Sequence, residues 1–142
     1  MIARVLAALD GTPIARRVVE VAAEIADRFD AELLLLRVIQ VPPEFPAPAA
    51  HGAPPDELPA SMRHHAEDEL RALSAGLPRA ARAALLIEEG EPWHAISDAA
   101  DRLAVDLVVM GSHIYRWPDA ILGTVAGRMA NHAHRNVLIV HR

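Results

Sequence analysis

The sequence of 142 residues contains neither cysteine nor lysine, and these two absences exclude several chemistries. Without cysteine there is no disulfide framework, no thiol nucleophile and no cysteine-ligated metal or iron–sulfur cluster. All 14 basic residues are arginine, so a Walker-type P-loop lysine, a lysine Schiff base and a lysine general base are excluded as well. The lack of cysteine is compatible with a reducing cytoplasm, which is the location we expect.

Aromatic residues are scarce, at 4% of the chain, so the core must be built from alanine, valine, leucine and isoleucine. The net charge is −5 and no basic stripe is present, which argues against a nucleic-acid partner. No apolar run approaches the roughly 18 residues that span a bilayer, so we expect no membrane partner. The opening residues run straight into a short apolar segment that ends at Asp10, so we expect no signal peptide.

Five short apolar runs alternate with four amphipathic segments along the chain. The runs cover residues 2–9, 33–41, 83–87, 106–110 and 136–141, and their continuous apolar character is typical of strands buried on both faces. Thr12 is predicted to cap the first helix, with Pro13 at its first position, and Pro92 is predicted to open the third. The strict alternation predicts one α/β domain over residues 1–142, with a five-stranded parallel sheet between two layers of helices.

Apolar residues at helical spacing predict the buried face of each helix. Seven of the 11 prolines lie between residues 42 and 59, which predicts an extended connection before the second helix. The predicted inward positions are Ile14, Val18, Val21, Ala22, Ile25 and Phe29, then Leu58, Met62, Ala66, Leu70, Leu73 and Leu77, then Trp93, Ile96, Ala100 and Leu103, and finally Val125, Met129 and Ala133.

Ligands of open parallel sheets bind beyond the carboxyl ends of the strands. Here those ends carry Asp10-Gly11-Thr12, the residues 37–40, and Met110-Gly111-Ser112-His113, while the last helix is predicted to start at Gly123-Thr124. The free N–H groups of that helix would favour an anion in the same crevice. The alternative is that Gly111 simply breaks the strand, that Gly123-Thr124 simply begins a helix, and that Asp10-Gly11 is an ordinary turn.

Other clusters in the sequence are better explained by structure than by chemistry. Adjacent His64 and His65 diverge on a helix, and His132 and His134 have no zinc-site spacing, so solvated or capping roles are expected. Ser112-His113 lacks a nucleophile elbow, and we assign no catalytic residue. Trp93 is expected in the core. Acidic residues are predicted to line wet helix faces at Asp56, Glu57, Glu67, Asp68 and Glu69.

Taken together, several segments resemble the universal stress protein family over nearly the whole chain. They are the opening strand that ends in Asp10-Gly11, Gly90-Glu91-Pro92, the stretch from Ala104 to His113, Leu122-Gly123-Thr124-Val125-Ala126, and residues 131–140. The resemblance implies a Rossmann-like, adenine nucleotide α-hydrolase-like fold. Some members bind ATP through a motif of glycine, two residues, glycine, nine residues, glycine and serine or threonine. Gly111 and Gly123-Thr124 match this motif, but Ile114 replaces its second glycine and the following gap is eight residues.

By this resemblance, ATP with magnesium would bind with its base near Ala8, Asp10 and Val38. Its sugar and phosphates would lie near Met110, Gly111, Gly123, Thr124 and Val125. The bulky Tyr115-Arg116-Trp117-Pro118 would either occlude the crevice or bring Arg116 to the phosphates.

The resemblance implies a stress-response protein that uses nucleotide as a regulatory ligand and is at most a weak ATPase. The alternative is a member that binds no nucleotide and acts through protein contacts. Many members pair through the last strand across a two-fold axis, so we expect a homodimer through residues 136–141.

Overall fold

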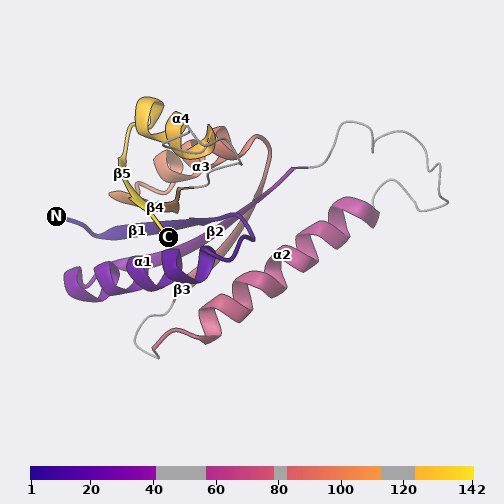
Figure 1. The fold of residues 1–142 in the computed structure, drawn as a ribbon, viewed down its shortest axis with the longest axis horizontal. Coiled ribbons are helices and arrows are strands. Elements are labelled where there is room, and N and C mark those ends of the chain that lie inside the picture. Colours follow the sequence, from indigo (N-terminus) through magenta and orange to yellow (C-terminus); the bar gives the residue numbers. More distant parts are fainter. Residues whose placement is uncertain (41–56, 79–82, 113–123) are drawn as a thin grey trace.

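A computed structural model describes residues 1–40, 57–78, 83–112 and 124–142 (Figure 1). Its five strands form one parallel sheet in the order β3-β2-β1-β4-β5, with one helix between each pair of successive strands. This confirms the predicted class and element order. The strands are β1 (Arg4–Leu9), β2 (Glu32–Ile39), β3 (Ala83–Glu89), β4 (Leu107–Gly111) and β5 (Asn136–Val140).

The four helices of the described residues cover the two faces of the sheet (Figure 1). One face carries α1 (Ala15–Phe29) and α2 (Glu57–Ala75), and the other carries α3 (Pro92–Arg102) and α4 (Thr124–His132). Alternate strand residues serve the two layers, because successive side chains of a strand point to opposite faces. Val5, Ala7 and Leu9 therefore pack under α1, while Leu6 and Ala8 pack under α3 and α4.

The start of α1 differs from the prediction. The helix begins at Ala15, its N-cap is Ile14, and no side chain caps it. Thr12 instead donates from its backbone N–H and its hydroxyl to Oδ1 of Asp10, at 3.1 and 2.6 Å. Pro13 therefore precedes the helix rather than opening it. The hydroxyl that was expected to cap the helix therefore donates a hydrogen bond to the carboxylate of Asp10 instead.

The buried face of α1 is built largely from alanine. Ala15, Val18, Val19, Ala22, Ala23 and Ala26 are buried, whereas Phe29 is 51% exposed and its predicted inward position is wrong. In α2 the fully buried residues are Ala66 and Leu70. The side chain of Leu58, most of the proline-rich connection and residues 113–123 lie outside the described residues.

The amino-terminal edge of the sheet is held by Asp106. Its Oδ2 accepts the backbone N–H groups of Ala3 and Arg4, at 2.8 and 2.9 Å, which ties the start of β1 to the start of β4. These two hydrogen bonds hold the pKa of the Asp106 carboxyl below its ordinary value. This contact lies at the opposite end of the strands from the predicted ligand crevice. Within the described ranges, no helix is long and apolar enough to cross a bilayer.

Candidate functional site

A cavity of about 400 Å³ opens at the carboxyl ends of β1, β2 and β4, where the topology predicts a ligand. Residues from α2, α3 and α4 complete its walls. Six of the eight predicted site residues line it, namely Ala8, Asp10, Val38, Met110, Gly111 and Val125. The structure therefore gathers residues from distant parts of the chain, from Ala8 on β1 to Ala126 on α4, into one hollow.

One wall of the cavity is apolar. Ala8, Leu36, Val38 and Met110 come from the strands, and Ile96 comes from α3; all five also belong to the core beneath α3 and α4. Apolar walls with a few polar groups at the rim are the usual lining of small-molecule sites. Such a wall suits the face of a flat ring.

The turn between β1 and α1 forms the polar rim at Asp10. Asp10 is exposed and lines the cavity, and its Oδ1 holds Thr12, which lines the cavity as well. Gly11 has φ +73°, a left-handed conformation that only glycine adopts without strain. Asp10 thus belongs both to a turn and to the lining of the cavity, so the two interpretations of the sequence do not exclude each other.

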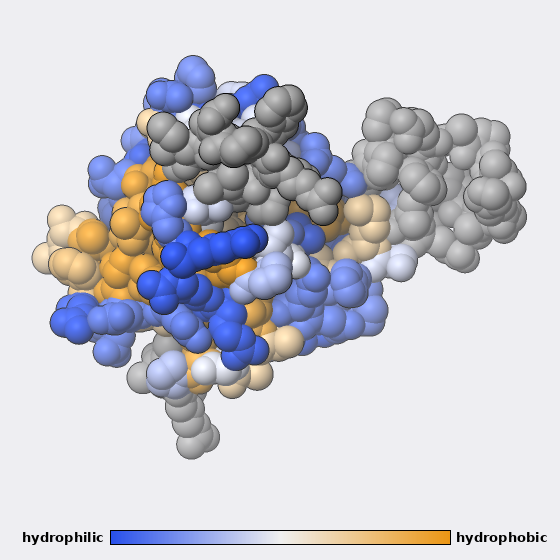
Figure 2. Space-filling model, viewed as in Figure 1, coloured by the Kyte–Doolittle hydropathy of each residue, from blue (hydrophilic) through white to orange (hydrophobic). Residues whose placement is uncertain are grey.

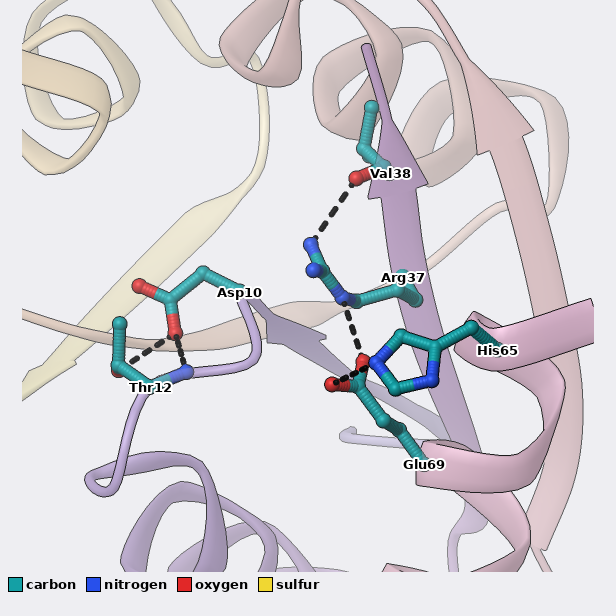
Figure 3. A network of polar contacts seen from close by, with 6 residues as sticks. All are labelled: Asp10, Thr12, Arg37, Val38, His65 and Glu69. Carbon is teal, nitrogen blue, oxygen red and sulfur yellow. Dashed lines mark hydrogen bonds and ion pairs between the residues drawn. The ribbon is translucent and has the colours of Figure 1, made fainter. Parts of the chain in front are cut away.

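Arg37 lies among the strand-end residues 37–40 but was not one of the eight predicted site residues, and it lines the cavity. It follows Leu33–Leu36 in a buried strand, and its guanidinium lies between the Asp10 turn and α2 (Figure 3). Nε donates to Oε2 of Glu69 at 3.2 Å, and Nη1 donates to the carbonyl of Val38 at 3.1 Å. The prediction that Glu69 lies on a wet face is wrong, since its side chain is 30% exposed and paired.

The strand that was predicted to stop at residue 110 includes Gly111. This glycine is the last residue of β4, opposite Val140 of β5, and its φ is not left-handed. A Cβ placed on it would lie 2.9 Å from Cγ2 of Ile14 and 3.6 Å from Cγ2 of Val18. The glycine therefore lets α1 approach the sheet closely, which is a packing requirement.

The predicted anion end of the site lies at α4, which begins at Thr124. Thr124 is exposed, and the next residue, Val125, lines the cavity. Gly123, Ile114, His113 and the segment 115–118 lie outside the described residues. The first N–H groups of α4 have no partner within the helix itself, as at any helix start, and they carry its positive dipole end.

Comparisons with known proteins identify the family of this chain. The sequence model of the universal stress protein family matches residues 1–141. The chain belongs to this family. No curated protein matches the sequence.

Solved structures of universal stress proteins share the fold. The protein UspA from Lactobacillus plantarum is 25% identical with a TM-score of 0.77, and the alignment covers 97% of both chains. A family protein from Burkholderia pseudomallei is 25% identical with a TM-score of 0.75, over 97% of this chain and 95% of that one. A universal stress protein in complex with cAMP is 24% identical with a TM-score of 0.64, over 99% of this chain and 96% of that one.

Four of the histidines that the structure describes, His64, His65, His94 and His134, lie beside carboxylates on the surface of this universal stress protein. His64 and His65 pair along α2 with Asp68 and Glu69, at 3.5 and 3.4 Å. His134 contacts Asp101, whose pKa is lowered chiefly by the hydrogen bond from Arg135. Among the described residues, no three side chains of metal-ligating type are grouped to hold an ion.

Two further predicted residues have structural surroundings. Trp93 packs against the core beneath α3 and α4, as expected, and the guanidinium of Arg128 lies 5.8 Å from the centre of its ring. Ser112 is buried at the end of β4, and its N–H donates to the carbonyl of Val140 at 2.9 Å. Neither residue lines the cavity described above.

Proposed function

We propose that this universal stress protein binds an adenine nucleotide, ATP with magnesium, and acts in the cytoplasm as a nucleotide-responsive stress protein. The observation that carries the proposal is the cavity at the carboxyl ends of β1, β2 and β4, which six of the eight predicted residues line. Its apolar wall would hold the base, and the start of α4 would receive the phosphates.

The chemistry of the chain favours binding over turnover. The chain has no lysine to stabilise a transferring phosphoryl group, and Arg37, the basic side chain among the residues that line the cavity, is already paired with Glu69. We therefore propose a regulatory ligand and at most a weak ATPase. A solved universal stress protein in complex with cAMP supports an adenine nucleotide as the class of ligand.

Titration calorimetry of the purified chain tests the proposal. We expect heat of binding and a rise in melting temperature with ATP and magnesium, because a ligand that binds only the folded state stabilises it. Titration without magnesium and titration with inorganic triphosphate are the controls for the metal and for the anion alone. The absence of both heat and thermal shift at millimolar ATP would favour a protein that acts through contacts with other proteins.

We further propose that the protein is a homodimer through β5. This strand is one edge of the sheet, and Leu138 on it is 37% exposed, next to the half-buried Val137 and Ile139. Figure 2 shows apolar residues gathered on the side of the molecule where β5 lies. An edge strand offers unpaired backbone groups to a second copy, and a two-fold axis would pair the strand with itself.

The exchange of Leu138 for arginine is expected to give a monomer, because two like charges would meet at the axis. Light scattering coupled to gel filtration measures the change in mass. Leu85→Arg is the matched control, since Leu85 is 38% exposed on β3, the opposite edge of the sheet. If Leu85→Arg dissociates the dimer while Leu138→Arg does not, the interface lies at β3.

A further inference from the structure

The guanidinium of Arg37 lies at the β2 end of the cavity and is only partly used by the protein. A guanidinium has five N–H donors. Nε donates to Glu69 and Nη1 donates to the carbonyl of Val38. Within the described part of the chain, Nη2 donates to no protein atom. Three donors of a residue that lines the cavity are therefore left for a ligand.

The guanidinium is also held in place before any ligand arrives. Glu69 on α2 and the Val38 carbonyl on β2 fix two of its nitrogens. The third, Nη2, lies over Gly11, where a Cβ would come within 2.9 Å of it. Figure 3 shows the group between the turn at Asp10 and the helix that carries Glu69 and His65. Its side chain is 23% exposed, so the donors are ordered yet reachable.

We propose that Arg37 reads the base of the bound nucleotide by donating a hydrogen bond to a ring nitrogen. The inference rests on the proposed function, in which the phosphates lie at the start of α4 after β4. In the sheet, β1 separates β2 from β4, so the ends of β2 and β4 are about 10 Å apart. The far end of the ligand, which is the base, therefore lies at the end of β2, with one face on the apolar wall. The side chain of Arg37 leaves the opposite face of β2, but Nη1 reaches the carbonyl of Val38 at the carboxyl end of the strand, which brings the guanidinium to the edge of the base.

The chemistry of the group selects the atom that it reads. Arginine only donates, so it pairs with the acceptor nitrogens of an adenine ring and not with its amino group. Glu69 pairs with Arg37 at 3.2 Å and offsets part of its charge, which makes the remaining donors better suited to the edge of a base than to a phosphate. A ring nitrogen of a base bound here would lose its hydrogen bond to water and accept one from the fixed guanidinium of Arg37.

Deaza analogues of ATP, in which one ring nitrogen is replaced by C–H, test the inference by calorimetry. We expect at least one of 1-deaza-, 3-deaza- and 7-deaza-ATP to bind the full chain about tenfold more weakly than ATP, the worth of a hydrogen bond to a charged group. Arg37→Met keeps an unbranched apolar stem and removes the donors. This variant should bind ATP about tenfold more weakly than the unaltered chain does. It should also bind ATP and the weakened deaza analogue with equal affinity.

Glu69→Gln is the matched control, because it breaks the same ion pair but leaves the donors of Arg37 in place. It should still discriminate between ATP and the analogue, whereas a purely structural role would make the two variants behave alike. The inference is overturned if every analogue binds the unaltered chain as tightly as ATP, or if Arg37→Met keeps the discrimination. Failure of ATP itself to bind would overturn the proposed function, and this inference with it.

Discussion

Exchange of Gly111 for alanine is expected to destabilise the protein by about 1–3 kcal/mol, the usual cost of overpacking a well-packed contact. The added Cβ would lie 2.9 Å from Cγ2 of Ile14. That methyl group is attached directly to a β-branched carbon with a stiff χ1, so it cannot swing aside freely. The start of α1 must move away from the sheet instead. Thermal unfolding should show a melting temperature lower by roughly 3–10 °C.

The double variant Ile14→Ala with Gly111→Ala separates this packing role from a role in ligand binding. If packing is the reason for the glycine, Gly111→Ala should lower the free energy of unfolding much less in the Ile14→Ala background than in the unaltered chain. The double variant would then differ strongly from the sum of the two single variants. If the glycine instead serves the approach of a phosphate, Gly111→Ala leaves the melting temperature unchanged and weakens ATP binding in both backgrounds.

The fold was predictable because each of its layers leaves a periodic signal. The run from Leu33 to Leu36 is apolar at every position, as expected of a strand covered on both faces, and such runs alternate strictly with helical segments. Right-handed crossovers then leave few topologies open. The place of the cavity followed from the same rule, since the ends of parallel strands lie at one edge of the sheet.

The details that failed depend on contacts between distant parts of the chain. Glu69 looks like any charge on a helix surface until the packing of α2 brings it within 3.2 Å of Arg37. The one available signal was Arg37 itself, a charge inside a buried strand that needs a partner. Phe29 fitted the helical spacing, but small alanines fill the buried face of α1 and leave this ring at its exposed end. Alanine is too weak an apolar marker to fix the face of a helix by itself.

Exchange of Ala8 for phenylalanine is expected to abolish ATP binding, with a loss of more than about 100-fold, while leaving the fold intact. Ala8 lines the cavity from β1 and is 7% exposed, and its side chain points to the layer that contains Met110 and Ile96. A phenyl ring there would occupy the space proposed for the base. Because the ring fills a hollow with apolar surface, the free energy of unfolding should stay unchanged or increase by up to about 2 kcal/mol. The melting temperature should accordingly stay the same or rise.

A loss of ATP affinity combined with unchanged or higher stability would indicate that the cavity serves a function. An open cavity at the carboxyl edge of the sheet leaves apolar surface exposed to water, and burial of such surface is worth about 25 cal/mol per Å². If filling the cavity raises the stability, the unaltered chain gives up this energy to keep room for a ligand. Ala130→Phe is the matched control, because Ala130 is exposed on α4 and lies outside the residues that line the cavity. Unchanged ATP affinity in Ala8→Phe would place the nucleotide elsewhere on the protein. Weakened binding in both variants would point to a general effect of the added ring.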